Sequence, residues 1–120
     1  MTINTITLIN LTPHAIVLRA ADGTDTVVEP SGTIARVSST PGTPSDVAGI
    51  PVPVWSADSM GEVTGLPDSS LSTLLIVSGM VGDACKGRRF DVLVPGTGPN
   101  DGAIRNEKGH IVAVTRLKRI

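Results

Sequence analysis

Backbone freedom and positive charge meet in the segment Val94–Arg105, which reads Val-Pro-Gly-Thr-Gly-Pro-Asn-Asp-Gly-Ala-Ile-Arg. Its glycines allow φ above zero and a close backbone approach, whereas its prolines restrict the loop between them. Exposed N–H groups of such a loop can face a ligand. We expect the flanking strands to bring several basic residues into the same half of the protein: Arg88, Arg89, Arg105, Lys108 and Arg116. The pattern predicts a pocket for an anion such as phosphate; the alternative is an ordinary surface loop.

Polar and basic side chains elsewhere extend this predicted site. His14 follows Thr12 and Pro13 at a tight turn, where it either contacts a ligand or stabilises the turn. Arg36 lies inside an aliphatic strand pattern, so its guanidinium either reaches solvent or meets a fixed anion. Arg105 and Arg116 are predicted on the two arms of one hairpin, where they either converge on a ligand or stay solvated. The predicted ligand-binding residues are Thr12, His14, Arg36, Gly96, Thr97, Gly98, Asn100, Arg105 and Arg116.

Catalytic and metal-binding patterns do not appear in the sequence. His14 and His110 are the only histidines, Cys85 stands alone, and no spacing matches a zinc or calcium site. The glycine-rich segment at residues 94–105, called the glycine loop below, lacks the Gly-Lys-Ser/Thr ending of a nucleotide-hydrolysing loop. Nothing in the spacing places a serine or Cys85 beside a histidine. We therefore predict a binding protein that is not an enzyme and that uses neither a metal nor a cofactor.

The composition favours strands over helices. Val, Ile and Thr account for 37 of the 120 residues, and 13 glycines and 9 prolines divide the chain into short segments. The length fits a single domain, residues 1–120. One Trp, one Phe and no Tyr leave a core of small aliphatic side chains, so association of subunits would hide further apolar surface. A homo-oligomer is therefore expected.

Charge is distributed unevenly along the chain. From Cys85 onward there are eight Lys/Arg and three Asp/Glu, a net charge of +5, whereas residues 1–84 carry two Lys/Arg and eight Asp/Glu, a net charge of −6. This split argues against a nucleic-acid partner and permits a local anion site, unless acidic and basic parts simply pair. The first residues lack a leader pattern, the apolar runs are too short to cross a bilayer, and a lone cysteine suits a reducing compartment. We expect a cytoplasmic protein with no membrane partner.

Short strands and one short helix are predicted along the chain. The expected strands are Thr5–Asn10, Ala15–Arg19, Asp25–Glu29, Thr33–Ser39, Met60–Gly65, Thr73–Val77, Phe90–Val94, Ala103–Arg105 and His110–Arg116. Residues 40–49 read as a loop, and Pro51 and Pro53 make Ile50–Trp55 an edge strand or an extended arm. A helix of one or two turns is expected near 79–86. The pattern predicts a mainly β fold, a small antiparallel barrel or sandwich.

Five segments resemble a family of small proteins encoded by phages and prophages. They are Asn10–His14, Pro30–Val37, Gly61–Pro67 and Val94–Pro99, together with Ile111–Val114. Small phage proteins of this size include sponges, which sequester nucleotide signals of bacterial defence systems such as Thoeris and CBASS without cleaving them. The resemblance implies a sponge for a small anionic nucleotide, such as a cyclic or conjugated ADP-ribose, acting in the cytoplasm of an infected bacterium. The alternatives are a phage structural, assembly or protein-interaction module and a small nucleotide-processing enzyme.

Overall fold

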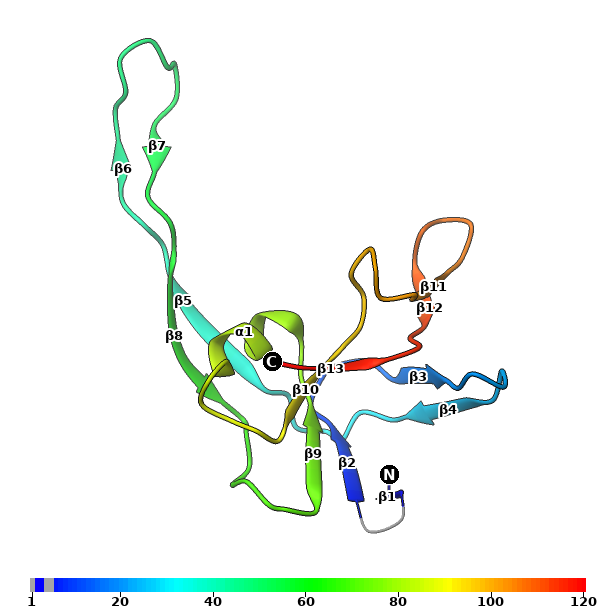
Figure 1. Cartoon of the computed structure of the whole chain (residues 1–120). Helices are drawn as coiled ribbons and strands as arrows, with labels where there is room; N and C mark the ends of the chain where they lie inside the picture. Colours follow the sequence, from blue (N-terminus) through cyan, green and yellow to red (C-terminus); the bar gives the residue numbers. More distant parts are fainter. Residues whose placement is uncertain (1, 4–5) are drawn as a thin grey trace.

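A five-stranded sheet forms the centre of the protein (Figure 1). The computed structural model describes residues 2–3 and 6–120, with side chains from residue 6 onward. Three neighbouring strands run parallel: β2 (Ile6–Asn10), β9 (Thr73–Ile76) and β10 (Val92–Pro95). β1 (Thr2–Ile3) pairs antiparallel with β2, and β13 (Leu117–Arg119) pairs antiparallel with β10. Thr5, the predicted first residue of the β2 strand, lies outside the described residues.

The predicted central strand at Thr73–Val77 is confirmed. Leu75, Ile76 and Val77 have no solvent exposure, because both faces of the sheet are covered. Side chains alternate between the two faces of a strand, so Leu75 and Val77 pack into one apolar cluster and Ile76 into the other. The apolar run thus reads as a strand buried on both sides.

The helix explains why the centre of the sheet is parallel. α1 (Gly79–Cys85) connects β9 to β10, and a crossover of this kind returns the chain to the sheet in the same direction. The helix predicted near 79–86 is confirmed, and Gly87 with φ of 79° follows it. The mainly β class is confirmed, but the expected antiparallel barrel or sandwich does not describe the centre of the sheet, where β2, β9 and β10 are parallel and α1 forms the crossover between two of them.

A hairpin covers the face of the sheet opposite α1. β3 (Ile16–Arg19) and β4 (Asp25–Val28) pair antiparallel, as the Asp22–Gly23 turn predicts, and Gly23 adopts a φ of 88°. Buried Val28 packs with Leu8, Ile76 and Leu93 of the central sheet. The hairpin therefore supplies one half of the core and α1 the other.

A second, longer hairpin leaves the body of the protein (Figure 1). β5 (Arg36–Thr40) pairs with β8 (Ser59–Thr64), and further out β6 (Pro44–Ser45) pairs with β7 (Val54–Trp55). Near the body, Val37 and Val63 pack against the cluster that contains α1. The predicted arm at Ile50–Trp55 belongs to the projecting end, and only its last two residues are in a strand.

The C-terminal strands differ from the prediction. β11 (Ile104–Arg105) and β12 (Ile111–Ala113) form the expected hairpin around a turn with Gly109 at φ 81°. The arm expected to continue to Arg116 ends at Ala113, because Val114 exchanges backbone hydrogen bonds with β3 and the chain then bends. Leu117 begins β13, which returns to the central sheet.

The described residues thus form a mainly β protein with one short helix. Its strands build the five-stranded sheet and four two-stranded ladders, and in the described part of the chain they close no barrel. No helix among these residues has the length and apolar character that crossing a bilayer requires.

Candidate functional site

Three loops meet at one edge of the central sheet. The parallel strands β2, β9 and β10 all end at this edge, and each is followed by a turn or loop. In open sheets with parallel strands, ligands commonly bind outside the carboxyl ends of the strands. The edge gathers Thr12 after β2, Ser78 after β9 and the glycine loop after β10. Ser78 is not among the residues predicted for the site. Its position directly after a buried apolar strand could have indicated that it lies at the carboxyl end of the sheet.

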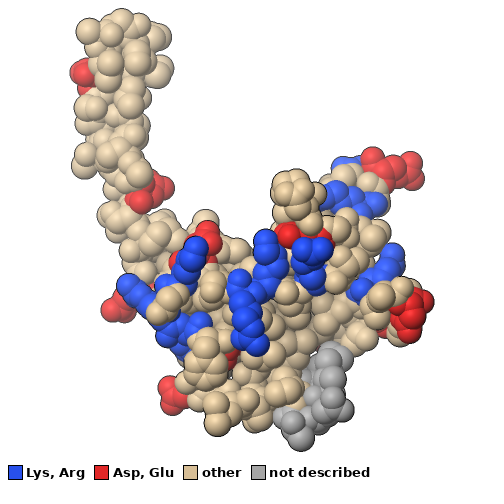
Figure 2. Space-filling view, in the orientation of Figure 1, with Lys and Arg blue, Asp and Glu red and all other residues tan. Residues whose placement is uncertain are grey.

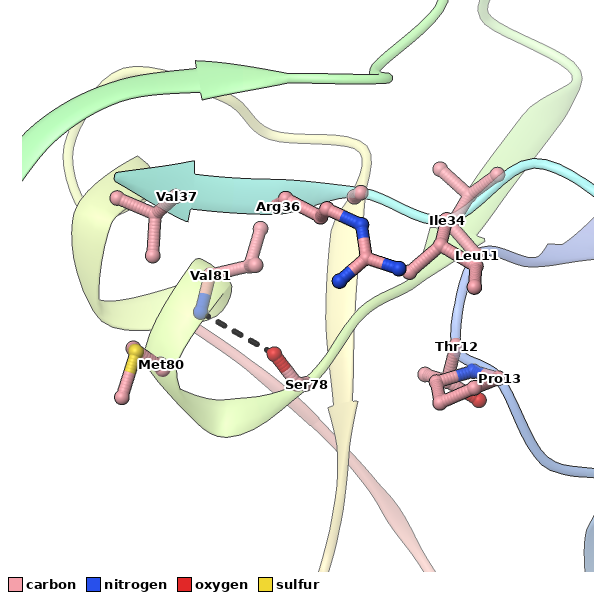
Figure 3. A pocket seen from close by; sticks show the side chains of 10 residues that line it. Leu11, Thr12, Pro13, Ile34, Arg36, Val37, Ser78, Met80 and Val81 are labelled. Atoms are coloured by element: carbon pink, nitrogen blue, oxygen red, sulfur yellow. Dashed lines mark hydrogen bonds between the residues drawn. The ribbon is translucent and has the colours of Figure 1, made fainter. Parts of the chain in front are cut away.

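A cavity of about 230 Å³ opens between the turn after β2, the start of β5 and α1 (Figure 3). Thr12, Arg36 and Ser78 line it together with Leu11, Ile34 and Met80. In Figure 3 the guanidinium of Arg36 projects into the space between Ser78 and the aliphatic side chains. Within the described residues this guanidinium takes part in no hydrogen bond or ion pair. The cavity therefore presents an uncompensated positive charge.

The turn after β2 is held by Asn10, which is 1% exposed. Asn10 Nδ2 donates to the carbonyls of His14 at 2.8 Å and Val28 at 3.0 Å, and its Oδ1 accepts from the Thr12 amide at 2.9 Å. Thr12 Oγ1 lies 2.6 Å from the same Oδ1. Asn10 thus fixes Thr12 at the cavity. Its position shortly before Thr12 and Pro13 indicates a turn but does not predict this role.

A second cavity of about 350 Å³ lies on the other side of Ser78. Thr97, Gly98, Asp101 and Lys118 line it, and Ser78 borders both cavities. Ligand pockets usually enclose about 300–1,000 Å³. The first cavity falls below this range, and the second lies within it.

The glycine loop is closed by a carboxylate of the protein itself. Gly98 N–H donates to Asp101 Oδ2 at 2.8 Å, and Gly96 N–H donates to the Arg116 carbonyl at 3.0 Å. The expectation that these amides face a ligand is therefore not met, because both are already bonded. Asp101 is 6% exposed, and Lys118 Nζ lies 3.3 Å from its Oδ2. The Gly98 amide and then Lys118 hold the pKa of Asp101 below its usual range.

Two of the loop glycines serve close packing. Gly102 has a φ of 73°, which favours glycine, but Gly96 and Gly98 are outside the positive-φ set. A Cβ at Gly96 would lie 2.5 Å from Arg116 Cγ, and one at Gly98 would lie 2.9 Å from Asp101 Oδ2. The glycine pattern thus allows the loop to pack around Asp101, which is not among the predicted ligand-binding residues.

Arg105 and Arg116 occupy different parts of this region. Arg105 donates to the carbonyls of Gly109 at 2.9 Å and Thr97 at 3.1 Å, so it ties the glycine loop to the β11–β12 hairpin. Its contact with a ligand stays a prediction, for which three of its five N–H donors remain. Arg116 lies in the bend after Val114, with Nη1 3.9 Å from Asp101 Oδ1, and not on the hairpin arm opposite Arg105 as expected.

His14 lies in a separate apolar groove of about 310 Å³. This apolar groove is lined mainly by β3, β12 and their flanks: His14, Ala15, Ile16, Val17, Pro95, Thr97, Ile111, Val112, Ala113 and Val114. Thr97 borders both this groove and the second cavity. Asn100 is exposed in the turn before Gly102. The structure therefore joins Thr12 with Arg36, places Thr97 and Gly98 next to them across Ser78, and leaves His14 apart.

Reactive groups do not gather at this edge. Among the described residues, no three His, Cys, Asp or Glu side chains are arranged to hold a metal ion. Cys85 is buried in the α1 cluster, and burial raises the pKa of its thiol. Lys and Arg side chains lie over the body of the protein, not over the projecting hairpin (Figure 2). No family model, curated protein or solved structure matches this chain.

Proposed function

We propose that this protein is a phage-encoded sponge, a non-catalytic binding protein that sequesters a small phosphate-bearing nucleotide such as a cyclic or conjugated ADP-ribose. The observation that carries the proposal is the free guanidinium of Arg36 over a cavity at the carboxyl edge of the parallel strands. The protein would act in the cytoplasm of the infected bacterium, where the signal is made.

Each part of the site has a distinct task under this proposal. Arg36 holds phosphate oxygens through two parallel N–H bonds, and the Ser78 hydroxyl, whose oxygen accepts from the Val81 amide, donates a neutral hydrogen bond. Thr12 Oγ1 donates its proton to Asn10 Oδ1, so it is left to accept from a ribose hydroxyl. Lys118, although shared with Asp101, supplies positive charge to the second cavity. Leu11, Ile34 and Met80 form the apolar surface against which a base or ribose packs.

Two internal contacts order the ligand-binding segments before a ligand arrives. Asn10 fixes the turn that carries Thr12, and Asp101 fixes the loop that carries Thr97. Because these segments are already ordered by hydrogen bonds, little entropy is lost when a ligand is bound. Affinity then depends on positioned groups, and a reactive side chain is unnecessary.

Arg36→Ala tests the proposal by calorimetric titration with candidate cyclic and conjugated nucleotides. Loss of a charge-assisted contact costs about 1.5–3 kcal/mol, so we expect affinity to fall about ten- to a hundredfold. Arg88→Ala is the matched control, because Arg88 is exposed and lies outside both cavities. An equal loss in both variants, or no binding of any candidate to the unaltered protein, contradicts the proposal.

The fate of the bound molecule separates the sponge from the other functional classes. The protein is incubated with nucleotide and then heated, and the released molecule is compared with the starting material. Recovery of unmodified nucleotide supports sequestration, whereas a new product would identify an enzyme. Recovery of the protein within purified phage particles would instead favour a structural role.

A further inference from the structure

The projecting end of the long hairpin exposes a row of apolar side chains. We define the arm as residues 41–58, which include β6 and β7. Val52 is 62% exposed and Trp55 is 57% exposed, and Val47, Ile50 and Val54 are also largely in solvent. Exposed apolar side chains gathered on one segment mark an interaction surface.

The arm has little internal support. Its strands β6 and β7 pair over only two residues each, and the other hydrogen bonds of the arm, such as Thr43 N–H to Ser56 Oγ, stay within it. An isolated two-stranded hairpin is marginally stable in water. The arm also extends the molecule: the radius of gyration is 17.6 Å, against about 14 Å for a compact domain of this length. A partner that covers the arm would hold it in place.

Proline restricts how such a partner can bind. Pro51 and Pro53 remove two backbone donors from the returning side of the arm, just before β7, which prevents a continuous strand ladder with another chain on that side. A partner would therefore recognise the arm through the side chains of Ile50, Val52 and Trp55. A defined groove suits these side chains better than an open sheet edge.

The chain itself carries a complementary surface. The apolar groove of about 310 Å³ is flanked by Ile111 and Val112, which are 39% and 45% exposed. Arg105 is bonded to Thr97 at the border of this groove, so the border is cationic. The arm carries Asp46 and Asp58 and no Lys or Arg. Apolar side chains and opposite charges thus match between arm and groove.

We propose that the arm of one copy docks in the apolar groove of a second copy, and that the exchange is reciprocal. In Figure 1 the arm and the β11–β12 hairpin, which borders the groove, lie on opposite sides of the body, so an arm does not reach its own groove. A two-fold arrangement uses the same pair of surfaces twice and closes on itself as a dimer. The assembly can be tested separately from the proposed nucleotide site, because neither Arg36 nor Thr12 lines the groove, although Thr97 borders both the groove and the second cavity.

Trp55, the single tryptophan, reports on the arm directly. We expect light scattering to give twice the monomer mass of 12.3 kDa. The emission of Trp55 should be blue-shifted and protected from acrylamide in the dimer, and should shift to the red on dilution. A monomer whose Trp55 stays accessible at all concentrations would overturn the proposal and assign the arm to a different partner.

Charge substitutions test both halves of the contact. Val52→Asp in the arm and Val112→Asp in the groove should each give a folded monomer with red-shifted Trp55 emission. Leu71→Asp is the control, because Leu71 is 92% exposed and lies outside both surfaces. Arg36→Ala should remain dimeric, which separates this proposal from nucleotide binding. A dimer that survives both Val substitutions overturns the assignment.

Mixing the two variants identifies the arrangement. One arm and one groove remain intact in a heterodimer of Val52→Asp and Val112→Asp, because the Val112→Asp arm can enter the Val52→Asp groove. We expect the mixture to form dimers that neither variant forms alone. Two folded variants that stay monomeric after mixing, while the Leu71→Asp control is dimeric, would contradict arm-in-groove exchange.

Discussion

At the scale of single residues, burial distinguishes two Arg–Asp pairs of similar geometry. Arg89 donates two hydrogen bonds to Asp91, of 2.9 and 2.8 Å, and Arg19 donates two to Asp25, of 2.7 and 3.0 Å. The Asp91 side chain is 1% exposed and that of Asp25 is 40% exposed. Removing one partner of a buried pair leaves an uncompensated charge, whereas water replaces the lost partner at the surface.

Asp91→Asn is therefore expected to lower the free energy of unfolding by about 3 kcal/mol. Asp25→Asn, the matched control, should have a much smaller effect. Urea denaturation at pH 7 measures both. Equal losses in the two variants would show that burial does not set the strength of these pairs.

The pH dependence of stability gives a second measure of what Asp91 contributes, by comparison with Asp91→Asn. The hydrogen bonds from Arg89 hold the pKa of Asp91 below its usual range. A lowered pKa in the folded state stabilises the protein fully above the unfolded-state pKa of about 4. This contribution is lost as pH falls through the lower, folded-state value. Melting temperatures of the unaltered protein should thus decline below about pH 4, and those of Asp91→Asn should decline less steeply.

Some candidate site residues can be read from the local sequence pattern alone. Arg36 is a candidate because a guanidinium interrupts an aliphatic strand pattern, and the structure places it at the first cavity. Asn10 and Asp101 are not among the predicted site residues. Each has a near partner, Thr12 or Gly98, but each also bonds to a group distant in the sequence: Asn10 to Val28 and Asp101 to Lys118. A local pattern does not show which distant groups such side chains will meet.

At the scale of elements, the contact between α1 and β10 depends on a glycine. Helix propensity favours alanine over glycine by about 1 kcal/mol in a helix interior. A Cβ at Gly82, however, would overlap the Val94 side chain and lie 3.1 Å from Ile120 Cγ2. Overpacking of a core typically costs about 1–3 kcal/mol, which exceeds the gain in propensity.

Gly82→Ala is therefore expected to destabilise the protein, by about 1 kcal/mol after the propensity gain is subtracted. Gly79→Ala is the control in the same helix, because a Cβ there would meet no atom within 4 Å. Thermal denaturation of both variants measures the difference. A Gly82→Ala protein as stable as Gly79→Ala would show that β10 moves away from α1 without cost.

Elements were predicted better than the pairing between them. The β3–β4 hairpin and α1 follow from a turn and a periodicity within a few residues. The pairing of β2 with β9 joins segments far apart in the chain, and an apolar strand pattern is compatible with either direction. β13 was missed because Lys118 and Arg119 face solvent on an edge strand, which leaves a weak apolar signal.

At the scale of the whole molecule, the body and the arm are separable in charge and in packing. The arm is apolar with two acidic residues, and the basic residues lie on the body (Figure 2). The core clusters draw on the central sheet, α1 and the inner part of the long hairpin, and they include no residue of the arm. The arm is therefore separate from the proposed ligand site, whereas the groove that would receive it shares Pro95 and Thr97 with the second cavity.

Replacing residues 41–58 by Asn-Gly should remove assembly and spare the body. Thr40 and Ser59 are already opposite each other in the β5–β8 ladder, and Asn-Gly forms a two-residue hairpin turn between such strands. We expect a monomer with an unchanged melting temperature, unchanged nucleotide affinity and a radius of gyration of about 13 Å by X-ray scattering. A shortened chain that unfolds or aggregates would instead show that the body depends on the arm. Retained dimers would place the subunit interface elsewhere on the protein.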